Sequence, residues 1–123
     1  MLRMIRGGFE ALTIGNPEHL ATDVGPVIDP DAKSSLERHI ARRKKGGRPV
    51  WRRRLHRGAN AGCFVAPTII EMDSILDLKR ENFGPILHVV RYRAADLERV
   101  IEDINSTGFG LTMGLHSRND DTR

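Results

Sequence analysis

The fold class is decided by one stretch of the sequence, residues 86–116, ILHVVRYRAADLERVIEDINSTGFGLTMGLH. Residues 86–92 are an apolar run rich in β-branched side chains, which predicts a buried strand. Asp96 is suited to cap the helix that follows and Gly108 to end it. The apolar residues of that helix recur at i, i+3, i+4 and i+7, and they are Leu97, Val100, Ile101 and Ile104. Because residues 111–116 predict another strand, the order is strand–helix–strand, which is typical of a βαβ unit in the α/β class.

Two helices are predicted in the first third of the chain. Residues 2–12 place four apolar side chains at helical spacing. Residues 13–28 are rich in Gly, Pro, Asn and Asp and predict a loop with several turns. In the second helix, Asp29 is suited to the N-cap, Pro30 to the first helical position and Gly46 to the C-terminal end.

The middle of the chain predicts short strands. Residues 48–54 are expected to form an exposed strand and residues 57–62 a turn. Two further apolar pieces, residues 64–65 and 68–70, flank Pro67 and predict short strands.

Length and composition exclude several classes of protein. A chain of 123 residues fits one domain or part of one. With 39% hydrophobic and 29% charged residues, it is not a disordered polyelectrolyte. No apolar run approaches the roughly 20 residues that span a bilayer, and no secretory signal is visible. A single Cys excludes an internal disulfide and a Cys-rich zinc site, so we expect a reduced, cytoplasmic protein.

The net charge of +4 comes from one segment. Residues 41–58, ARRKKGGRPVWRRRLHRG, carry nine Lys or Arg residues and no acid, which leaves 11 basic against 16 acidic residues elsewhere. A nucleic-acid-binding protein more often spreads its basic residues over one face of the fold, and Trp51 alone makes no stacking platform. We therefore expect residues 41–60 to be a solvated, variable basic loop and do not expect nucleic acid as a partner.

Three other features resemble functional sites, but we expect a structural role for each of them. The glycine-rich residues 108–114 follow a helix, whereas a dinucleotide-binding loop precedes one, so a helix stop is expected. Cys63 lies in an apolar run and is expected to be buried and inert. The histidines show no metal-ligand spacing, so we assign no metal site, and we expect His88 to be a core residue with a satisfied hydrogen bond; they are His19, His39, His56, His88 and His116.

Several ordered motifs together resemble the aldehyde dehydrogenase superfamily. Glu81-Asn82-Phe83-Gly84-Pro85 resembles its E-x-F-G-P element, and a hydrophobic strand follows in both. The segment Gly62-Cys63-Phe64-Val65-Ala66-Pro67-Thr68 resembles its G-x-F-x-x-P-T segment. Residues 105–112, NSTGFGLT, resemble its N-x-T-x-x-G-L segment, and Gly15-Asn16-Pro17 resembles the loop after its catalytic-cysteine region.

Four further segments resemble one branch of that superfamily, the L-glutamate γ-semialdehyde (1-pyrroline-5-carboxylate) dehydrogenase domain of bifunctional proline-utilisation proteins. They are residues 22–29, 37–40, 87–92 and 114–118. The resemblance covers nearly the whole chain and is weakest at residues 1–8 and 41–60. It implies part of the catalytic domain of an aldehyde dehydrogenase fold, in which helices flank a parallel sheet.

The resemblance implies NAD-dependent oxidation of a small-molecule aldehyde in the full-length enzyme. A cysteine thiolate adds to the aldehyde, hydride passes to NAD, and water releases the acid. Glu81 would hold the hydroxyls of the nicotinamide ribose, because a carboxylate accepts two hydroxyl hydrogen bonds at once. Phe83 would pack against the nicotinamide end of the cofactor, and Gly84 and Pro85 would set the turn that presents both.

The chain differs from the family pattern at the position of the catalytic cysteine. The family's nucleophile lies well upstream of the segment that contains Cys63, so no catalytic residue is assigned here. We therefore expect residues 1–123 to be an internal fragment that needs the remaining part of the domain and is inactive alone. Two alternatives stay open: another aldehyde dehydrogenase branch, or a non-catalytic remnant that binds polyanions through residues 42–57.

Overall fold

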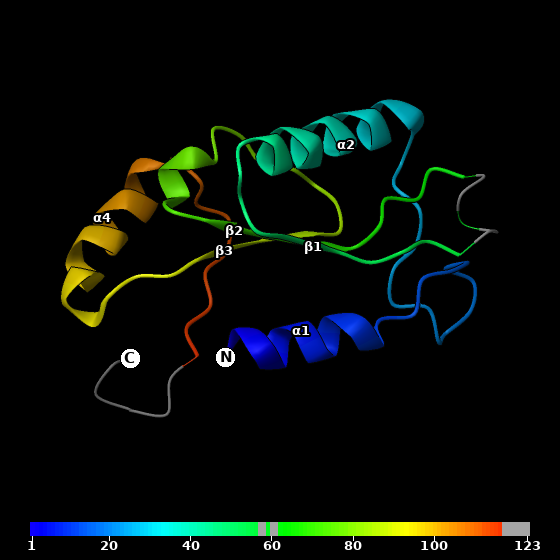
Figure 1. The fold of residues 1–123 in the computed structure, drawn as a ribbon, viewed down its shortest axis with the longest axis horizontal. Coiled ribbons are helices and arrows are strands. Elements are labelled where there is room, and N and C mark those ends of the chain that lie inside the picture. The colour runs from blue at the N-terminus through cyan, green and yellow to red at the C-terminus, as the bar shows by residue number, and fades with distance from the viewer. Residues whose placement is uncertain (57–58, 60–61, 117–123) are drawn as a thin grey trace.

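A three-stranded sheet crosses the centre of the molecule (Figure 1). The computed structural model describes residues 1–56, 59 and 62–116. The strands β1 (Val50–Arg52), β2 (Thr68–Met72) and β3 (Ile86–Val90) lie in the order β1-β2-β3. β1 runs antiparallel to β2, and β2 runs parallel to β3. The α/β class predicted from the sequence is confirmed, but the described sheet is mixed, whereas the family resemblance implied a parallel one.

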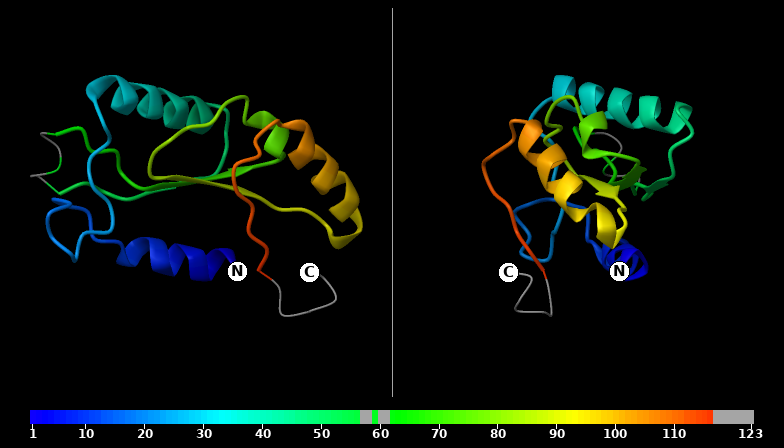
Figure 2. Two further views of the ribbon diagram at one scale, coloured as in Figure 1. Left: turned by 180° about the vertical axis from the view of Figure 1, so that it is seen from behind. Right: turned by 90° about the vertical axis from the view of Figure 1, so that its left-hand side faces the viewer.

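Helices lie on both faces of this sheet. α1 (Leu2–Ala11) and α2 (Pro30–Lys45) lie on opposite sides of it, as both views in Figure 2 show. α4 (Leu97–Ser106) packs at one end of the sheet beside the short 3₁₀ helix η1 (Ile75–Asp77). A second 3₁₀ turn, η2 (Ala94–Asp96), leads into α4.

One apolar cluster joins α2 to the sheet. Its buried members come from α2, from β2 and from the segment before β2, and they are Leu36, Ile40, Val65, Ile70 and Met72. Each buried aliphatic side chain of this size stabilises the fold by about 1.5–3 kcal/mol. This cluster therefore determines how α2 lies on the sheet.

The ends of α2 follow the sequence prediction closely. The Asp29 carboxylate accepts a hydrogen bond from the backbone N–H of Ala32 at 2.6 Å, and Pro30 occupies the first helical position. The helix ends at Gly46, as predicted, but the left-handed backbone conformation belongs to the next residue, Gly47, at φ 74°. Glycine adopts that conformation without the steric cost of a Cβ atom.

Two predicted strands are absent from the part of the chain that the structure describes. Residues 64–65 run irregularly before β2, and residues 111–116 form a bend and irregular backbone with no strand partner among the described residues, so the predicted βαβ unit was wrong at its second strand. Leu111 and Met113 are 89% and 76% exposed. A strand needs a hydrogen-bonded neighbour, and these residues lie beside none.

β3 is only partly buried, although the sequence predicted a buried strand. It is the edge strand of the described sheet, and its Leu87 is 45% exposed. The predicted cap of the last helix was also wrong in detail, because Asp96 holds the N-cap position but its side chain accepts no hydrogen bond there. Gly108 ends α4 as predicted, with φ 74°.

The basic segment is ordered structure over much of its length. Residues 41–45 are the last turns of α2, and residues 50–52 form β1 inside the strand predicted for residues 48–54, which confirms that strand. The expectation of a loop over the whole of residues 41–60 was wrong for these parts. Hydrogen bonds to β2 hold β1 in place: Val50, Trp51 and Arg52 pair with Ile70, Ile69 and Thr68. The predicted turn at residues 57–62 falls largely outside the described residues, as do residues 117–118 of the last family motif.

None of the helices described here combines the length and the apolar character that crossing a membrane requires.

Candidate functional site

Glu81 and Phe83 lie on the connection between η1 and β3. Both side chains are exposed, and that of Phe83 is 79% exposed. An exposed aromatic ring leaves a large apolar surface in water, which favours packing against another apolar or aromatic group. The structure thus presents a carboxylate and an aromatic ring two residues apart on the same loop.

The loop is held firmly against α2. A Cβ atom added to Gly84 would lie 2.5 Å from Cδ1 of Leu36, so the backbone packs directly on a core side chain. Arg80 donates a hydrogen bond from Nη2 to Oγ of Ser35 at 3.0 Å, and the side-chain amide of Asn82 donates to the carbonyl of Arg80 at 2.9 Å. These contacts lie on both sides of Glu81 and restrict the movement of its backbone.

The loop is also tied to the sheet. The backbone N–H of Thr68, at the start of β2, donates to the carbonyl of Pro85 at 2.9 Å, and that of Ile86 donates to the carbonyl of Gly84 at 2.7 Å. Gly84 and Pro85 therefore connect the exposed pair of side chains to the most buried strand of the sheet.

Beneath this loop, two histidines meet between α2 and β3. The Nε2 atoms of His39 and His88 are 2.9 Å apart and the rings are nearly perpendicular, at 80°. His39 is 2% exposed. Nη2 of Arg42 lies 3.4 Å from Nδ1 of His39, and since a guanidinium only donates, Nδ1 is the acceptor. The proton of neutral His39 is then on Nε2, from which it is donated to His88.

The pair is neutral at pH 7. Burial, together with the charges of His88, Arg43, Arg42 and Arg80, lowers the pKa of His39 to about 4. Burial and Arg43 also lower the pKa of His88. The expectation that His88 has a satisfied hydrogen bond is confirmed, although the residue is half-buried. The role of His39 was not predicted from the sequence, and its position three residues after Leu36 on the apolar face of α2 was the available signal.

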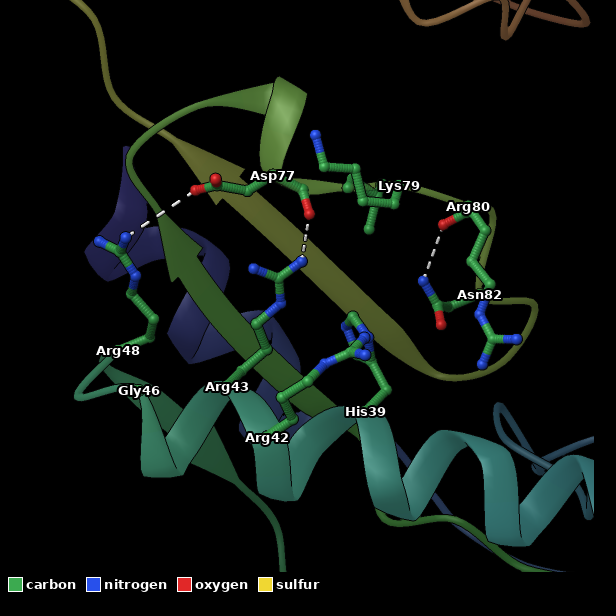
Figure 3. A pocket seen from close by; sticks show the side chains of 10 residues that line it. His39, Arg42, Arg43, Gly46, Arg48, Asp77, Lys79, Arg80 and Asn82 are labelled. Carbon is green, nitrogen blue, oxygen red and sulfur yellow. Dashed lines mark hydrogen bonds and ion pairs between the residues drawn. The ribbon is translucent and has the colours of Figure 1, made fainter.

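A cavity of about 430 Å³ lies between the last turns of α2 and residues 77–82 (Figure 3). Arg42, Arg43 and His39 point into it from the helix, and Lys79, Arg80 and Asn82 line the facing segment. Arg43 donates from Nη2 to the carbonyl of Asp77 at 2.5 Å, which links the two walls.

The other sequence candidates lie away from this region. Cys63 is free but half-buried, so the expectation that it is buried was wrong. Its carbonyl accepts a hydrogen bond from the N–H of Val27 at 2.8 Å. It does not line the cavity beside Glu81. In the residues that the structure describes, no three His, Cys, Asp or Glu side chains are grouped as metal ligands would be.

The chain belongs to the aldehyde dehydrogenase family, whose characteristic sequence pattern matches residues 2–123. It is 48% identical over 126 residues to the bifunctional protein PutA of Escherichia coli, an alignment that covers 98% of this chain and 10% of that protein. The corresponding protein of Rhizobium meliloti is 51% identical over 106 residues, covering 86% of this chain and 9% of the relative. The chain therefore spans about a tenth of the length of these curated relatives.

Solved structures agree with the sequence matches. A variant of proline utilization A (PutA) from Bradyrhizobium japonicum superimposes with a TM-score of 0.85 at 48% identity, covering 99% of this chain and 12% of that one. A variant of an aldehyde dehydrogenase from Bacillus cereus gives a TM-score of 0.79 at 26% identity, covering 98% and 24%. The fold is thus a part of the aldehyde dehydrogenase fold.

Proposed function

We propose that the chain contributes the nicotinamide-ribose contacts of an NAD-dependent L-glutamate γ-semialdehyde dehydrogenase, acting in the oxidation of proline to glutamate. The observation that carries this proposal is the loop of Glu81 and Phe83, which is anchored to α2 and β2 while both side chains remain exposed. A backbone that is already held in place lowers the entropic cost of binding, and the exposed side chains stay available to contact a ligand.

In this proposal the two residues divide the task. Bound NAD supplies the hydride acceptor. The Glu81 carboxylate accepts hydrogen bonds from both ribose hydroxyls, and Phe83 covers the nicotinamide end with its exposed ring. Gly84 and Pro85 keep the loop on the sheet, so that the two side chains hold a constant separation.

The relatives support the choice of substrate. The chain is 46–51% identical to four PutA proteins. It is 32% identical to the betaine aldehyde dehydrogenase of Vibrio vulnificus. This difference favours the branch that oxidises L-glutamate γ-semialdehyde over other aldehyde dehydrogenase branches. We therefore propose a small aldehyde as the substrate and the cytoplasm as the location of the protein.

The 123-residue chain by itself is proposed to be inactive. Cys63 is its only thiol, and it lies in the irregular segment before β2, hydrogen-bonded through its backbone to Val27. Large apolar side chains remain exposed in the described part of the chain, among them Phe83, Leu87, Leu111 and Met113. We propose that the remaining part of the dehydrogenase domain covers these side chains and supplies the nucleophile.

A chimaera tests the proposal directly. The chain replaces the segment of Escherichia coli PutA that aligns with it, and NADH formation is measured with L-glutamate γ-semialdehyde. We expect activity, and we expect Glu81→Gln to raise the KM for NAD by about tenfold or more, because hydrogen bonds to a charged group are worth about 1.5–3 kcal/mol. Glu98→Gln, at an exposed position on α4, is the matched control and should leave KM unchanged.

Two outcomes would oppose the proposal. A folded chimaera that does not oxidise the aldehyde would remove the assigned reaction. Equal kinetics of Glu81→Gln and Glu98→Gln would remove the assigned role of Glu81 while leaving the reaction in place. Aldehyde-dependent NADH formation by the purified 123-residue chain would contradict its proposed inactivity.

A further inference from the structure

The cavity between α2 and residues 77–82 concentrates positive charge. Five cationic side chains line it, Arg42, Arg43, Arg48, Lys79 and Arg80. Among the described residues, Asp77 is the only acidic one in the lining, and it lies 3.8 Å from Arg48, which also pairs with Asp73. Even with both carboxylates counted, the described residues leave an excess of three positive charges around a space of about 430 Å³.

Most of these cations have no carboxylate partner in the described part of the chain. The ion pairs found there join Arg48, Arg52, Arg53 and Arg91 to acids, and none includes Lys79 or Arg80. The Nε atom of Arg43 is buried and has no hydrogen-bond partner among the described residues. A buried donor without an acceptor costs about 1–3 kcal/mol, which a bound anion would recover.

The partial negative charge at the C-terminal end of α2 explains the cations on only one wall of the cavity. Basic residues in the last turn of a helix interact favourably with its partial negative charge, and this explains Arg42 and Arg43 in part. It does not explain Lys79 and Arg80, which come from a non-helical segment on the opposite wall. Two segments far apart in sequence thus contribute cations without a carboxylate partner to the lining of one cavity.

We propose that this cavity is a binding site for a small phosphate-bearing anion. A phosphate group carries up to two negative charges on several acceptor oxygens, so it can accept hydrogen bonds from guanidinium groups on both walls at once. The half-open cavity admits either free phosphate or the phosphate of a larger molecule. The site is separate from the proposed contacts of Glu81 and does not depend on them, although Arg80 and Asn82 flank that residue and line the cavity.

The test is calorimetric titration of the 123-residue chain with inorganic phosphate at low ionic strength. Arg43→Gln and Lys79→Gln remove one charge from each wall, and each should weaken phosphate binding by about tenfold or more. Lys44→Gln is the matched control, because it removes the same charge from the neighbouring position of α2 but lies outside the cavity. It should change the affinity by less than about twofold.

Backbone NMR shifts add a readout of position. Phosphate should move the amide signals of Lys79, Arg80 and Asn82, and the Lys79→Gln variant keeps the test valid if Arg43→Gln fails to fold. Displacement of phosphate by NAD would identify a nucleotide as the source of the anion, and phosphate binding that NAD does not displace would identify free phosphate or a phosphomonoester; both support the site.

Three results would overturn the inference. One is the absence of phosphate binding to the folded chain. Another is equal weakening by Lys44→Gln and Arg43→Gln, which would indicate diffuse attraction by surface charge. The third is binding of an oligoglutamate peptide without binding of phosphate, which would assign the cavity to an acidic segment of a protein.

Discussion

The variant Gly84→Ala tests how the loop of Glu81 and Phe83 is attached to the apolar cluster around Leu36. A Cβ atom at this position would lie 2.5, 3.2 and 3.4 Å from three side-chain atoms of Leu36, whereas carbon atoms in contact normally lie about 3.5–4.0 Å apart. Leu36 is 3% exposed and belongs to the apolar cluster, so it has little room to move. The φ of Gly84 is not positive, and backbone strain therefore plays no part.

The expected size of the effect follows from two opposing contributions. Overpacking of a well-filled core costs about 1–3 kcal/mol. Replacing Gly by Ala lowers the entropy of the unfolded chain and stabilises the fold by about 0.4–1 kcal/mol. Gly84→Ala should therefore reduce the free energy of unfolding by about 1–2 kcal/mol, since the cost of overpacking exceeds the entropic gain.

Urea unfolding followed by the fluorescence of Trp51, the single Trp of the chain, measures this change. With a denaturant dependence of about 1–3 kcal/mol per molar, the midpoint should fall by roughly 1 M. Gly110→Ala is the matched control, because nothing lies within 4 Å of its added Cβ. Its midpoint should stay equal or rise.

The double variant decides whether Leu36 is the cause. Leu36→Ala alone should cost about 2–5 kcal/mol, but it removes the three atoms that the new Cβ would meet. In that background Gly84→Ala should no longer destabilise the chain. Additive losses within about 0.5 kcal/mol would refute the reasoning, because contacting residues are expected to couple.

Three further predictions concern stability. Because the pKa of His39 is about 4 in the folded chain and about 6.5 when unfolded, only the unfolded chain binds this proton between those values. Stability should be complete above about pH 6.5 and fall by up to about 3 kcal/mol toward pH 4 in urea titrations. His39→Gln should flatten this slope, and an unchanged slope in that variant would contradict the assignment. Asp29→Ala should lower the free energy of unfolding by about 0.5–2 kcal/mol through loss of the cap of α2, and no change in the urea midpoint would show that the cap is not needed. Ile70→Ala should cost about 2–5 kcal/mol, whereas Ile101→Ala, at a position 41% exposed, should cost less than half as much; similar thermal shifts would argue against the core described here.

Local signals in the sequence predicted α2 and its ends well. An N-cap carboxylate at Asp29 and a proline at the first position act within one helical turn, so their effect is readable without the rest of the fold. The motif of Glu81 to Pro85 was equally local, and the family it indicated is confirmed. The roles of Glu81 and Phe83 stay predictions, now with a fixed and exposed loop to support them.

Local sequence patterns did not predict which distant segments pair as strands. The apolar residues 111–116 have the composition of a strand, yet no neighbour in the described structure completes their hydrogen bonds. Residues 48–54 were predicted to form a strand, yet the sequence did not show that Trp51 pairs with Ile69 or that β1 runs antiparallel to β2. In both cases the partner, and not the segment itself, decides the pairing.

The sequence by itself therefore determined the α/β class, the helix boundaries that depend on capping residues, and the family. Only the tertiary structure decided that β1 is antiparallel, that His39 meets His88 across 49 positions of the chain, and that cations from α2 and from residues 77–82 share one cavity. Capping and periodicity act over a few residues, whereas strand partners and cavity walls arise from packing that brings distant residues together.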